Sequence, residues 1–218
     1  GAGISQESGI TTFRDQNGLW ENHKIEEVAS PEGFAKNPQL VLDFYNARRK
    51  QLDEVHPNEA HILIAQLETK YKITVITQNI DDLHERAGST NVLHLHGELK
   101  TCRSSDNENL VYPYDNPLQI GDIASDGSQL RPNVVWFGEE VPNIEKAIAI
   151  TQSADLFVIV GTSMVVHPAA SLLLAVPYDV ETVYIDTNPD VNEGINLVVI
   201  KEKASVGVNL LINEMLPI

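Results

Sequence analysis

The stretch KITVITQNI, Lys72–Ile80, has the composition of a buried β-strand that ends in polar residues. Its β-branched run is short, as expected for a strand that is covered on both faces of a parallel sheet. ADLFVIVGTS, Ala154–Ser163, and VETVYIDTN, Val180–Asn188, repeat the pattern. Helical periodicity lies between and beyond these strands, at residues 37–51, 58–71, 143–153 and 206–215. The alternation predicts a doubly wound parallel α/β domain, which binds ligands at the carboxyl ends of its strands.

The composition limits the class of protein. The 218 residues are 42% hydrophobic and have a mean hydropathy of −0.15, as in ordinary globular proteins. No apolar run approaches the roughly 20 residues of a membrane span, and no stretch resembles a signal peptide. A single cysteine, Cys102, excludes an internal disulfide and favours a cytoplasmic location. The net charge of −16 disfavours nucleic acid and membrane surfaces as partners and favours basic segments of other proteins.

The periodic pattern stops between Lys100 and Pro132, where Ser, Asp, Asn, Gly and Pro surround isolated apolar residues. We expect a small inserted lobe at residues 100–131 and a main domain made of residues 1–99 and 132–218. The residues expected to form the lobe's own core are Leu110, Val111, Tyr112, Tyr114, Leu118 and Ile120. A core of this size is marginal, so the lobe should be more mobile than the main domain.

The segment GAGISQESGI, Gly1–Ile10, begins with a glycine-rich loop that opens toward a helix. Such a loop lets backbone N–H groups approach a phosphate, although a bare G-x-G is also an ordinary turn. The continuation TTFRDQNGLW, Thr11–Trp20, adds an arginine and aromatic residues that could cover a ligand. Loops of this type follow a buried strand, so we expect residues before Gly1.

Two histidines, His94 and His96, flank Leu95 and precede a glycine. Three interpretations are open: a pair of metal ligands, a catalytic base and ordinary strand alternation. Alternation places the two side chains on opposite faces of a strand. No acidic or thiol companion stands in sequence range, which argues against a metal pair. His94 is expected to be packed or hydrogen-bonded, whereas His96 is either a base or a structural strand histidine.

Five segments in order resemble the sirtuins, the NAD-dependent protein-lysine deacylases. They are GAGISQESGITTFR (1–14), TQNIDDLHERAG (77–88), LHGEL (95–99), VVWFGE (134–139) and GTS (161–163). No single segment is specific for the sirtuins by itself. The five segments together, in the order and spacing of the family, are highly specific. The resemblance covers nearly the whole chain outside the small lobe, and it implies that the main domain is Rossmann-like and binds NAD.

The resemblance implies that His96, the histidine before Gly-Glu, is the general base. The carbonyl oxygen of an acyl-lysine would attack the nicotinamide ribose and expel nicotinamide. His96 would then draw a proton from a ribose hydroxyl, which attacks the imidate intermediate; an imidazole with a pKa near neutral suits this role. Water would release lysine and O-acyl-ADP-ribose. The expected partners are therefore acylated lysine side chains of other proteins.

The resemblance also implies which residues bind NAD. They are Gly1, Ala2, Gly3, Ser5, Gly9, Thr12, Phe13, Arg14, Trp20, Gln78, Asn79, Ile80, Asp81, Gly161, Thr162, Ser163, Asp186, Thr187, Asn188 and Ala204. Asn79 and Asp81 would contact nicotinamide and its ribose, and Asp186 would hold the adenine-side ribose.

Each of these polar side chains also has a structural interpretation. Residues 78–81 could cap a strand end, and Thr162 and Ser163 could cap the helix expected for HPAASLLL. Arg14 could be a solvated surface residue.

FYNARR, Phe44–Arg49, resembles the sirtuins that remove acidic acyl groups, in which a Tyr and an Arg three residues later face the acyl tail. Residues i and i+3 share a helix face, so Tyr45 and Arg48 can reach the same carboxylate. Bacterial relatives with this motif process both acyl types, so we expect removal of acetyl, succinyl and malonyl groups. The alternative is that the pair is surface decoration on a plain deacetylase, and Arg49 and Lys50 are expected on the helix surface.

Val134, Phe137 and Gly138 are expected to bind the substrate. In the family, this segment is a strand that pairs with the substrate peptide, an example of β-augmentation. The alternative is an aromatic core strand that ends in a turn glycine.

The chain departs from the family at the zinc site. Sirtuins typically carry four cysteines in the small lobe, the number of ligands that a structural zinc needs. Here only Cys102 stands near the first of these positions, and residues 100–131 contain no histidine. We therefore expect no zinc.

Two other functions remain open. A sirtuin-like ADP-ribosyltransferase would use the same cofactor pocket and depend less on His96. A non-catalytic module that reads acyl-lysine would be favoured if His96 or Asn79 were replaced, and neither is. A dinucleotide-dependent oxidoreductase is disfavoured because the chain has no second glycine-rich turn.

Overall fold

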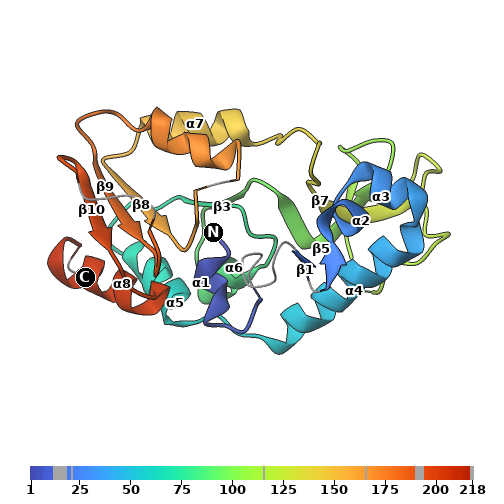
Figure 1. The fold of residues 1–218 in the computed structure, drawn as a ribbon, viewed down its shortest axis with the longest axis horizontal. Coiled ribbons are helices and arrows are strands. Elements are labelled where there is room, and N and C mark those ends of the chain that lie inside the picture. Colours follow the sequence, from blue (N-terminus) through green and yellow to red (C-terminus); the bar gives the residue numbers. More distant parts are fainter. Residues whose placement is uncertain (12–18, 21, 115, 165, 190–193, 217–218) are drawn as a thin grey trace.

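The computed structural model describes residues 1–11, 19–20, 22–114, 116–164, 166–189 and 194–216. It has an α/β fold in which a body with parallel strands continues into a smaller lobe (Figure 1). Its strands are β1 (Leu19–Trp20), β2 (His23–Lys24), β3 (Val75–Thr77), β4 (Val92–His94), β5 (Gly97–Ser104), β6 (Val111–Pro113), β7 (Leu130–Val134), β8 (Leu156–Val160), β9 (Glu181–Ile185) and β10 (Leu197–Ile200). Its helices are α1 (Gly3–Gln6), α2 (Ile25–Val28), α3 (Pro31–Lys36), α4 (Pro38–Glu54), α5 (Glu59–Leu67), α6 (Leu83–Ala87), α7 (Ile144–Gln152), the 3₁₀ helix η2 (Ala169–Ala175) and α8 (Ala204–Glu214). Within these residues, no helix has the length and apolar character needed to cross a membrane.

The body contains two parallel sheets. One has the strand order β10-β9-β8, and the other pairs β3 with β4. The three strands predicted from the sequence are confirmed as β3, β8 and β9, each shorter than its apolar segment. A cavity of about 490 Å³ lies between the two sheets and is lined by side chains of both, including Val75 and Val158.

Side-chain caps explain where several helices begin. The side chains of Ser30, Asn37 and Asn58 each accept a hydrogen bond from a backbone N–H in the first turn of α3, α4 and α5, at 2.9, 3.2 and 3.0 Å. A cap of this kind contributes about 1 kcal/mol, and a proline also follows Ser30 and Asn37 as the first helical residue. The four helices predicted from periodicity are confirmed as α4, α5, α7 and α8.

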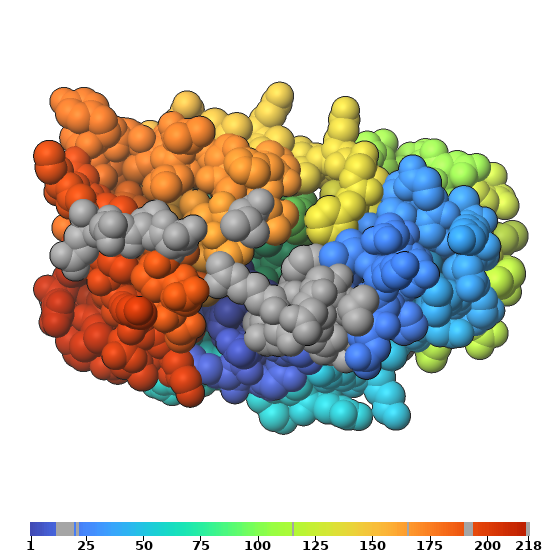
Figure 2. Space-filling view, viewed as in Figure 1, coloured from blue at the N-terminus to red at the C-terminus, as the bar shows by residue number. Residues whose placement is uncertain are grey.

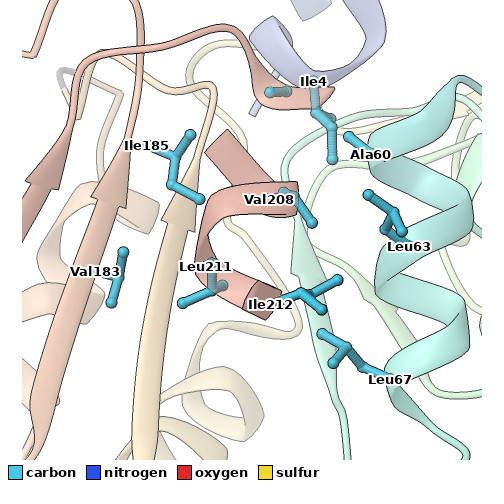
Figure 3. Packing of buried hydrophobic residues seen from close by; sticks show 10 residues of the cluster. Ile4, Ala60, Leu63, Leu67, Val183, Ile185, Val208, Leu211 and Ile212 are labelled. Atoms are coloured by element: carbon cyan, nitrogen blue, oxygen red, sulfur yellow. The ribbon is translucent and has the colours of Figure 1, made fainter. Parts of the chain in front are cut away.

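The main core of the body lies between α5, α8 and β9 (Figure 3). Its buried side chains include Ile4, Leu63, Leu67, Val183, Ile185, Val208, Leu211 and Ile212. Burying a side chain of this size contributes about 1.5–3 kcal/mol. The apolar side chains of helices α5 and α8 therefore pack against those of strand β9 in this core.

The small lobe is built on an antiparallel sheet with the order β6-β5-β7. Helices α2, α3 and α4 lie beside this sheet (Figure 1), and α4 packs against β5 and β7. The buried core of the lobe consists of Leu42, Cys102, Leu118, Ala124 and Leu130, with Tyr112 and Tyr114 packed against it. The prediction was wrong for Leu110, which is not part of this core, and for Val111 and Ile120, which are 45% and 56% exposed. Val111 lies on the edge strand β6, and Leu42 of α4 supplies part of the core instead.

The prediction that Arg49 lies on the helix surface was also wrong. Its side chain is only 4% exposed. Its Nε donates to the carbonyl of Leu99 at 2.9 Å, and Nη1 donates to the carbonyl of Asn116 at 3.2 Å. Nearby on α4, the Asn46 amide exchanges two hydrogen bonds of 2.8 Å with the backbone of Leu118. Arg49 and Asn46 thus connect α4 to the lobe.

Candidate active site

A cleft of about 530 Å³ lies at the carboxyl ends of β3, β8 and β9 and reaches the small lobe. In the space-filling view, green atoms from the middle of the chain are recessed between orange and yellow segments (Figure 2). The expected site residues that line the cleft are Gly1, Ala2, Gly3, Ser5, Trp20, Tyr45, Arg48, Gln78, Asn79, Ile80, Asp81, His96, Val134, Phe137, Gly138, Gly161, Thr162, Ser163, Asp186 and Thr187. Segments far apart in sequence therefore form one surface.

His96 faces the cleft with one ring nitrogen fixed. Its Nδ1 is 3.1 Å from the carbonyl oxygen of Gln78. Because a carbonyl oxygen can only accept, Nδ1 carries the proton and Nε2 keeps its lone pair. Burial lowers the pKa of His96, so the ring is neutral at pH 7 and can accept a proton. The next residue must be small, because Gly97 has a φ of +80° and a Cβ there would collide with the carbonyl of Asn133.

His94 has a structural environment, as expected. Its Nδ1 lies 2.9 Å from the carbonyl oxygen of Asn79, and its Nε2 lies 2.8 Å from the Glu85 carboxylate. Burial opposes its charged form, but these hydrogen bonds raise the pKa of His94. The two histidines thus have opposite pKa shifts: His94 is held between two acceptors, whereas only His96 faces the cleft.

A cluster of three polar side chains connects α1 to the end of β3. The Ser5 hydroxyl donates to Asp81 Oδ2 at 2.9 Å, and the Asn79 amide donates to Ser5 Oγ at 3.1 Å. Both Asn79 and Asp81 are buried, and burial raises the pKa of Asp81. Asp81 also accepts from the N–H of Leu83 at 3.2 Å. One Asp81 oxygen therefore holds the first residue of α6, and the other belongs to the cluster at the cleft.

The far end of the cleft is formed by the loops after β8 and β9. Gly3 N donates to the carbonyl of Gly161 at 2.8 Å, so the two glycine-containing loops touch. Asp186 follows β9 and accepts from the N–H of Asn188 at 2.8 Å.

The N-cap interpretation of Thr162 and Ser163 was wrong. The helix in this segment is the 3₁₀ helix η2, which begins at Ala169; its N-cap is Pro168, and no side chain caps it. The Thr162 hydroxyl instead accepts from the N–H of Met164 at 3.3 Å.

Tyr45 and Arg48 both line the cleft from α4. The Tyr45 ring is fully buried, and its hydroxyl oxygen accepts from the Trp136 indole N–H at 3.0 Å. Burial raises the pKa of Tyr45, so the hydroxyl stays protonated and can donate. The Arg48 guanidinium lies over the Phe44 ring, 5.3 Å from its centroid. Two donors three residues apart thus face the same cavity.

The segment after β7 differs from the expected strand. β7 ends at Val134, and Gly138 lies in a turn with a φ of +92°. The N–H of Phe137 donates to the carbonyl of Ala29 at 3.0 Å, and the Phe137 ring is 51% exposed. Phe137 and Gly138 therefore form a turn at the edge of the cleft, and the alternative of an aromatic core strand was wrong.

Some expected residues do not reach the cleft. Gly9, Asn188 and Ala204 do not line it, and Ala204 belongs to the main core instead. Thr12, Phe13 and Arg14 lie outside the described residues.

Other lining residues were not expected, notably Trp136 and Glu139. The motif VVWFGE contains both of them, so the sequence signal was present although their contacts were not readable.

Comparisons with known proteins agree with this arrangement. The model of the Sir2 family matches residues 1–168. A protein of Helicobacter pylori named NAD-dependent protein deacylase is 59% identical over 186 residues, which are 85% of this chain and 81% of that protein. A Bacteroides thetaiotaomicron protein of the same name is 52% identical over an alignment of 224 positions that covers 100% of this chain and 96% of that protein.

Solved structures give the same answer. The complex of a Sir2 homologue with NAD matches with a TM-score of 0.86 and 39% identity, covering 97% of this chain and 85% of that one. A Sir2 complex with a p53 peptide and NAD⁺ matches with a TM-score of 0.78 and 31% identity, covering 98% and 90%. The chain belongs to the Sir2 family.

Proposed function

We propose that this protein is an NAD-dependent protein-lysine deacylase that removes acetyl and acidic acyl groups. The observation that carries the proposal is the state of His96, a neutral imidazole whose Nδ1 is bound to a backbone carbonyl and whose Nε2 is free to accept a proton in the cleft. The names of the H. pylori and B. thetaiotaomicron relatives support the activity.

The residues present fit NAD. A volume of about 530 Å³ is within the usual range for ligand pockets, about 300–1,000 Å³. Polar groups suited to ribose hydroxyls and amides stand at both ends, with Asn79 and Asp81 after β3 and Asp186 after β9. NAD would supply a ribose carbon that is open to attack once nicotinamide leaves.

The chain's own residues then have separate tasks. Asn79 and Asp81 hold the nicotinamide end, with Ser5 fixing their orientation through two hydrogen bonds. His96 takes a proton from a ribose hydroxyl at Nε2, while Gln78 stabilises the protonated ring by accepting from Nδ1. Positioning of this kind is needed because proton transfer requires heavy atoms about 2.6–3.2 Å apart.

The substrate is an acylated lysine in another protein. Val134, Phe137 and Gly138 line the cleft edge where the peptide would lie, and a Sir2 neighbour is a complex with a p53 peptide. The net charge of −16 would attract lysines that stand in basic segments.

The acyl tail lies between Tyr45 and Arg48. An acidic tail ends in a carboxylate, which a guanidinium can hold while a tyrosine hydroxyl donates a further hydrogen bond. An acetyl group also fits but gains nothing from this pair. We therefore propose dual activity, with Arg48→Met depressing desuccinylation and raising its KM while sparing deacetylation.

The test is incubation with NAD and acetyl-, succinyl- or malonyl-lysine peptides, followed by mass spectrometry. Free lysine, nicotinamide and O-acyl-ADP-ribose are the expected products. His96→Ala and His96→Tyr should abolish turnover and leave NAD binding largely intact. ADP-ribose attached to the peptide would indicate a transferase, and binding without any product would indicate a non-catalytic module. Near wild-type turnover in either His96 variant would contradict the assignment of the base.

A further inference from the structure

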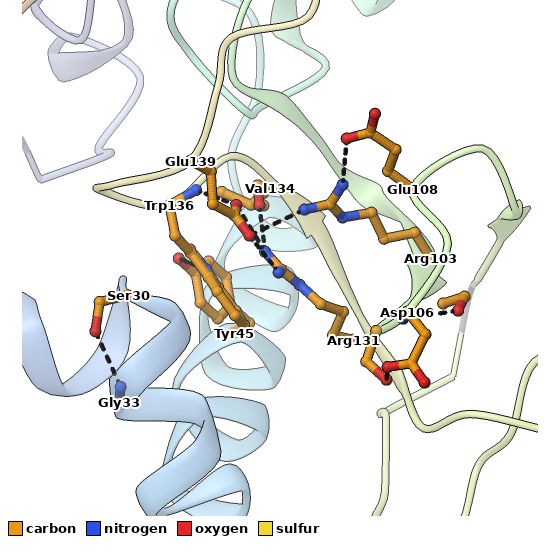
Figure 4. A network of polar contacts seen from close by, with 12 residues as sticks. Ser30, Gly33, Tyr45, Arg103, Asp106, Glu108, Arg131, Val134, Trp136 and Glu139 are labelled. Carbon is orange, nitrogen blue, oxygen red and sulfur yellow. Dashed lines mark hydrogen bonds and ion pairs between the residues drawn. The ribbon is translucent and has the colours of Figure 1, made fainter.

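Behind the Tyr45 hydroxyl lies a connected set of side chains from β7 and the turn that follows it (Figure 4). Arg131 forms a bidentate pair with Glu139, with Nη1 to Oε1 at 2.6 Å and Nη2 to Oε2 at 3.1 Å. Nη2 also donates to the carbonyl of Val134 at 2.8 Å. Glu139 Oε2 accepts from the backbone N–H of Trp136 at 2.8 Å. The turn is thus closed around a partly buried ion pair.

Trp136 is held on two sides by this arrangement. Its backbone is fixed by Glu139, and the guanidinium carbon of Arg131 lies 3.2 Å from the centroid of its ring. A cation over an indole is attracted to the ring and draws electron density from it. The indole N–H is then a stronger donor, and Tyr45 Oη is its acceptor at 3.0 Å.

The direction of this hydrogen bond decides what Tyr45 can do. Because the hydroxyl oxygen accepts from Trp136, the hydroxyl proton is available for another acceptor. No such acceptor appears among the described hydrogen bonds of the chain. Tyr45 lines the cleft whereas Arg131 does not. Arg131 therefore acts on a bound acyl group indirectly, through Trp136, Glu139 and the carbonyl of Val134.

We propose that Trp136, held by the Arg131–Glu139 pair, is a positioning residue that directs the Tyr45 hydroxyl toward the acyl tail and thereby sets the preference for acidic acyl groups. The inference rests on the proposed deacylase function and on Tyr45 as a contact of the acyl carboxylate. It goes beyond that function because it assigns the geometry of the contact to residues of β7 and of the turn that follows it.

The test compares kcat/KM for succinyl-lysine and acetyl-lysine peptides in Trp136→Phe, Tyr45→Phe and the double variant. Trp136→Phe keeps an aromatic ring near Arg131 and removes the N–H together with part of the bicyclic ring. We expect Trp136→Phe to lower the succinyl-to-acetyl ratio about three- to ten-fold, the value of one neutral hydrogen bond. Tyr45→Phe should lower it about ten- to a hundred-fold, because the hydrogen bond that it removes is to a carboxylate. The double variant should be no worse than Tyr45→Phe, because Trp136 acts through Tyr45.

Two further variants distinguish a specific effect of Arg131 on Trp136 from a general effect of disturbing the lobe. Arg131→Lys keeps the charge and loses the bidentate fork, so the ratio should fall. Arg103→Lys is the matched control, since Arg103 reaches the same Glu139 carboxylate at 3.2 Å but is not the residue that covers Trp136. Its ratio should stay at the wild-type value.

The outcomes distinguish the inference from the function. If Tyr45→Phe lowers the ratio but Trp136→Phe does not, the inference is wrong and the acyl assignment stands. Additive effects in the double variant would also overturn it, as would equal changes in Arg131→Lys and Arg103→Lys. If Tyr45→Phe leaves the ratio unchanged, the acyl assignment itself fails. Thermal melting of each variant shows whether it is folded under the assay conditions, and a ratio from an unfolded variant is discarded.

Discussion

Replacing Arg49 by Met should destabilise the whole protein, although Arg49 does not line the cleft. The side chain is 4% exposed and donates to two backbone carbonyls, those of Leu99 on β5 and Asn116 in the lobe. Met preserves much of the aliphatic stem and removes both donors. The lobe would then lose a connection to α4 at two points.

The magnitude follows from these two hydrogen bonds. A bond to a charged donor contributes about 1.5–3 kcal/mol, and the bond to Leu99 is buried, whereas the bond to Asn116 is only partly buried. Counting the second bond at a reduced value, we expect a loss of about 2–4 kcal/mol in the free energy of unfolding. For a chain of this size, such a loss lowers Tm by roughly 5–15 °C.

Urea denaturation and thermal melting measure this effect directly. Lys50→Met is the matched control, because it removes the same charge from an exposed position on the same helix, and it should change stability by less than about 0.5 kcal/mol. Arg49→Lys should fall between the two variants. The reasoning is refuted if Arg49→Met and Lys50→Met melt at the same temperature.

Three other results are expected. Burial lowers the pKa of His61 to about 4 and that of His84 to about 3; the unfolded chain therefore binds more protons below pH 6.5, and stability falls as the pH falls from there toward 4. His84→Leu should reduce the loss in the free energy of unfolding between pH 7 and pH 5 by about 2 kcal/mol. Urea denaturation at both pH values measures this loss, and an equal loss in the variant and the wild type would contradict the prediction. Gly97→Ala should cost roughly 2–4 kcal/mol because its Cβ meets the Asn133 carbonyl, whereas Gly121→Ala, with open space around it, should cost about 1 kcal/mol; equal melting temperatures would exclude the collision. Metal analysis should find no stoichiometric zinc, and chelators should not change Tm; a one-to-one zinc content would overturn our interpretation of the lobe.

The body could be predicted from the sequence because its signals are local. β3, β8 and β9 are short apolar runs, and the helices between them repeat apolar residues at helical spacing. The lobe gave no such signal. Its longest strand, β5, reads GELKTCRS and is buried only in part. It lies between the strands β6 and β7 and packs against α4. A polar strand of this kind can be recognised only from its partners, which lie elsewhere in the chain.

The site was predictable for a related reason. Parallel strands end at one edge of a sheet, so polar residues after separate strands, such as Asn79 and Asp186, could be expected in one cleft. Trp136 and Glu139 stand inside a motif that lines this cleft. Their contacts were out of reach, because Trp136 meets Tyr45 across 91 positions of sequence. The sequence thus predicted that the ends of β3 and β9 lie at one cleft. It did not predict the side-chain contacts of Trp136 and Glu139.

Helix α4 shows why Arg48 and Arg49 could not be told apart by sequence. Successive residues of a helix point about 100° apart, so the pairs 45/48 and 46/49 occupy adjacent faces. Tyr45 and Arg48 face the cleft, while Asn46 and Arg49 bond the lobe. Both faces contain an arginine, and only the position of the lobe decides which one is buried. The side chains that connect α4 to the lobe therefore also fix the rotation of the helix that presents the proposed acyl-binding pair.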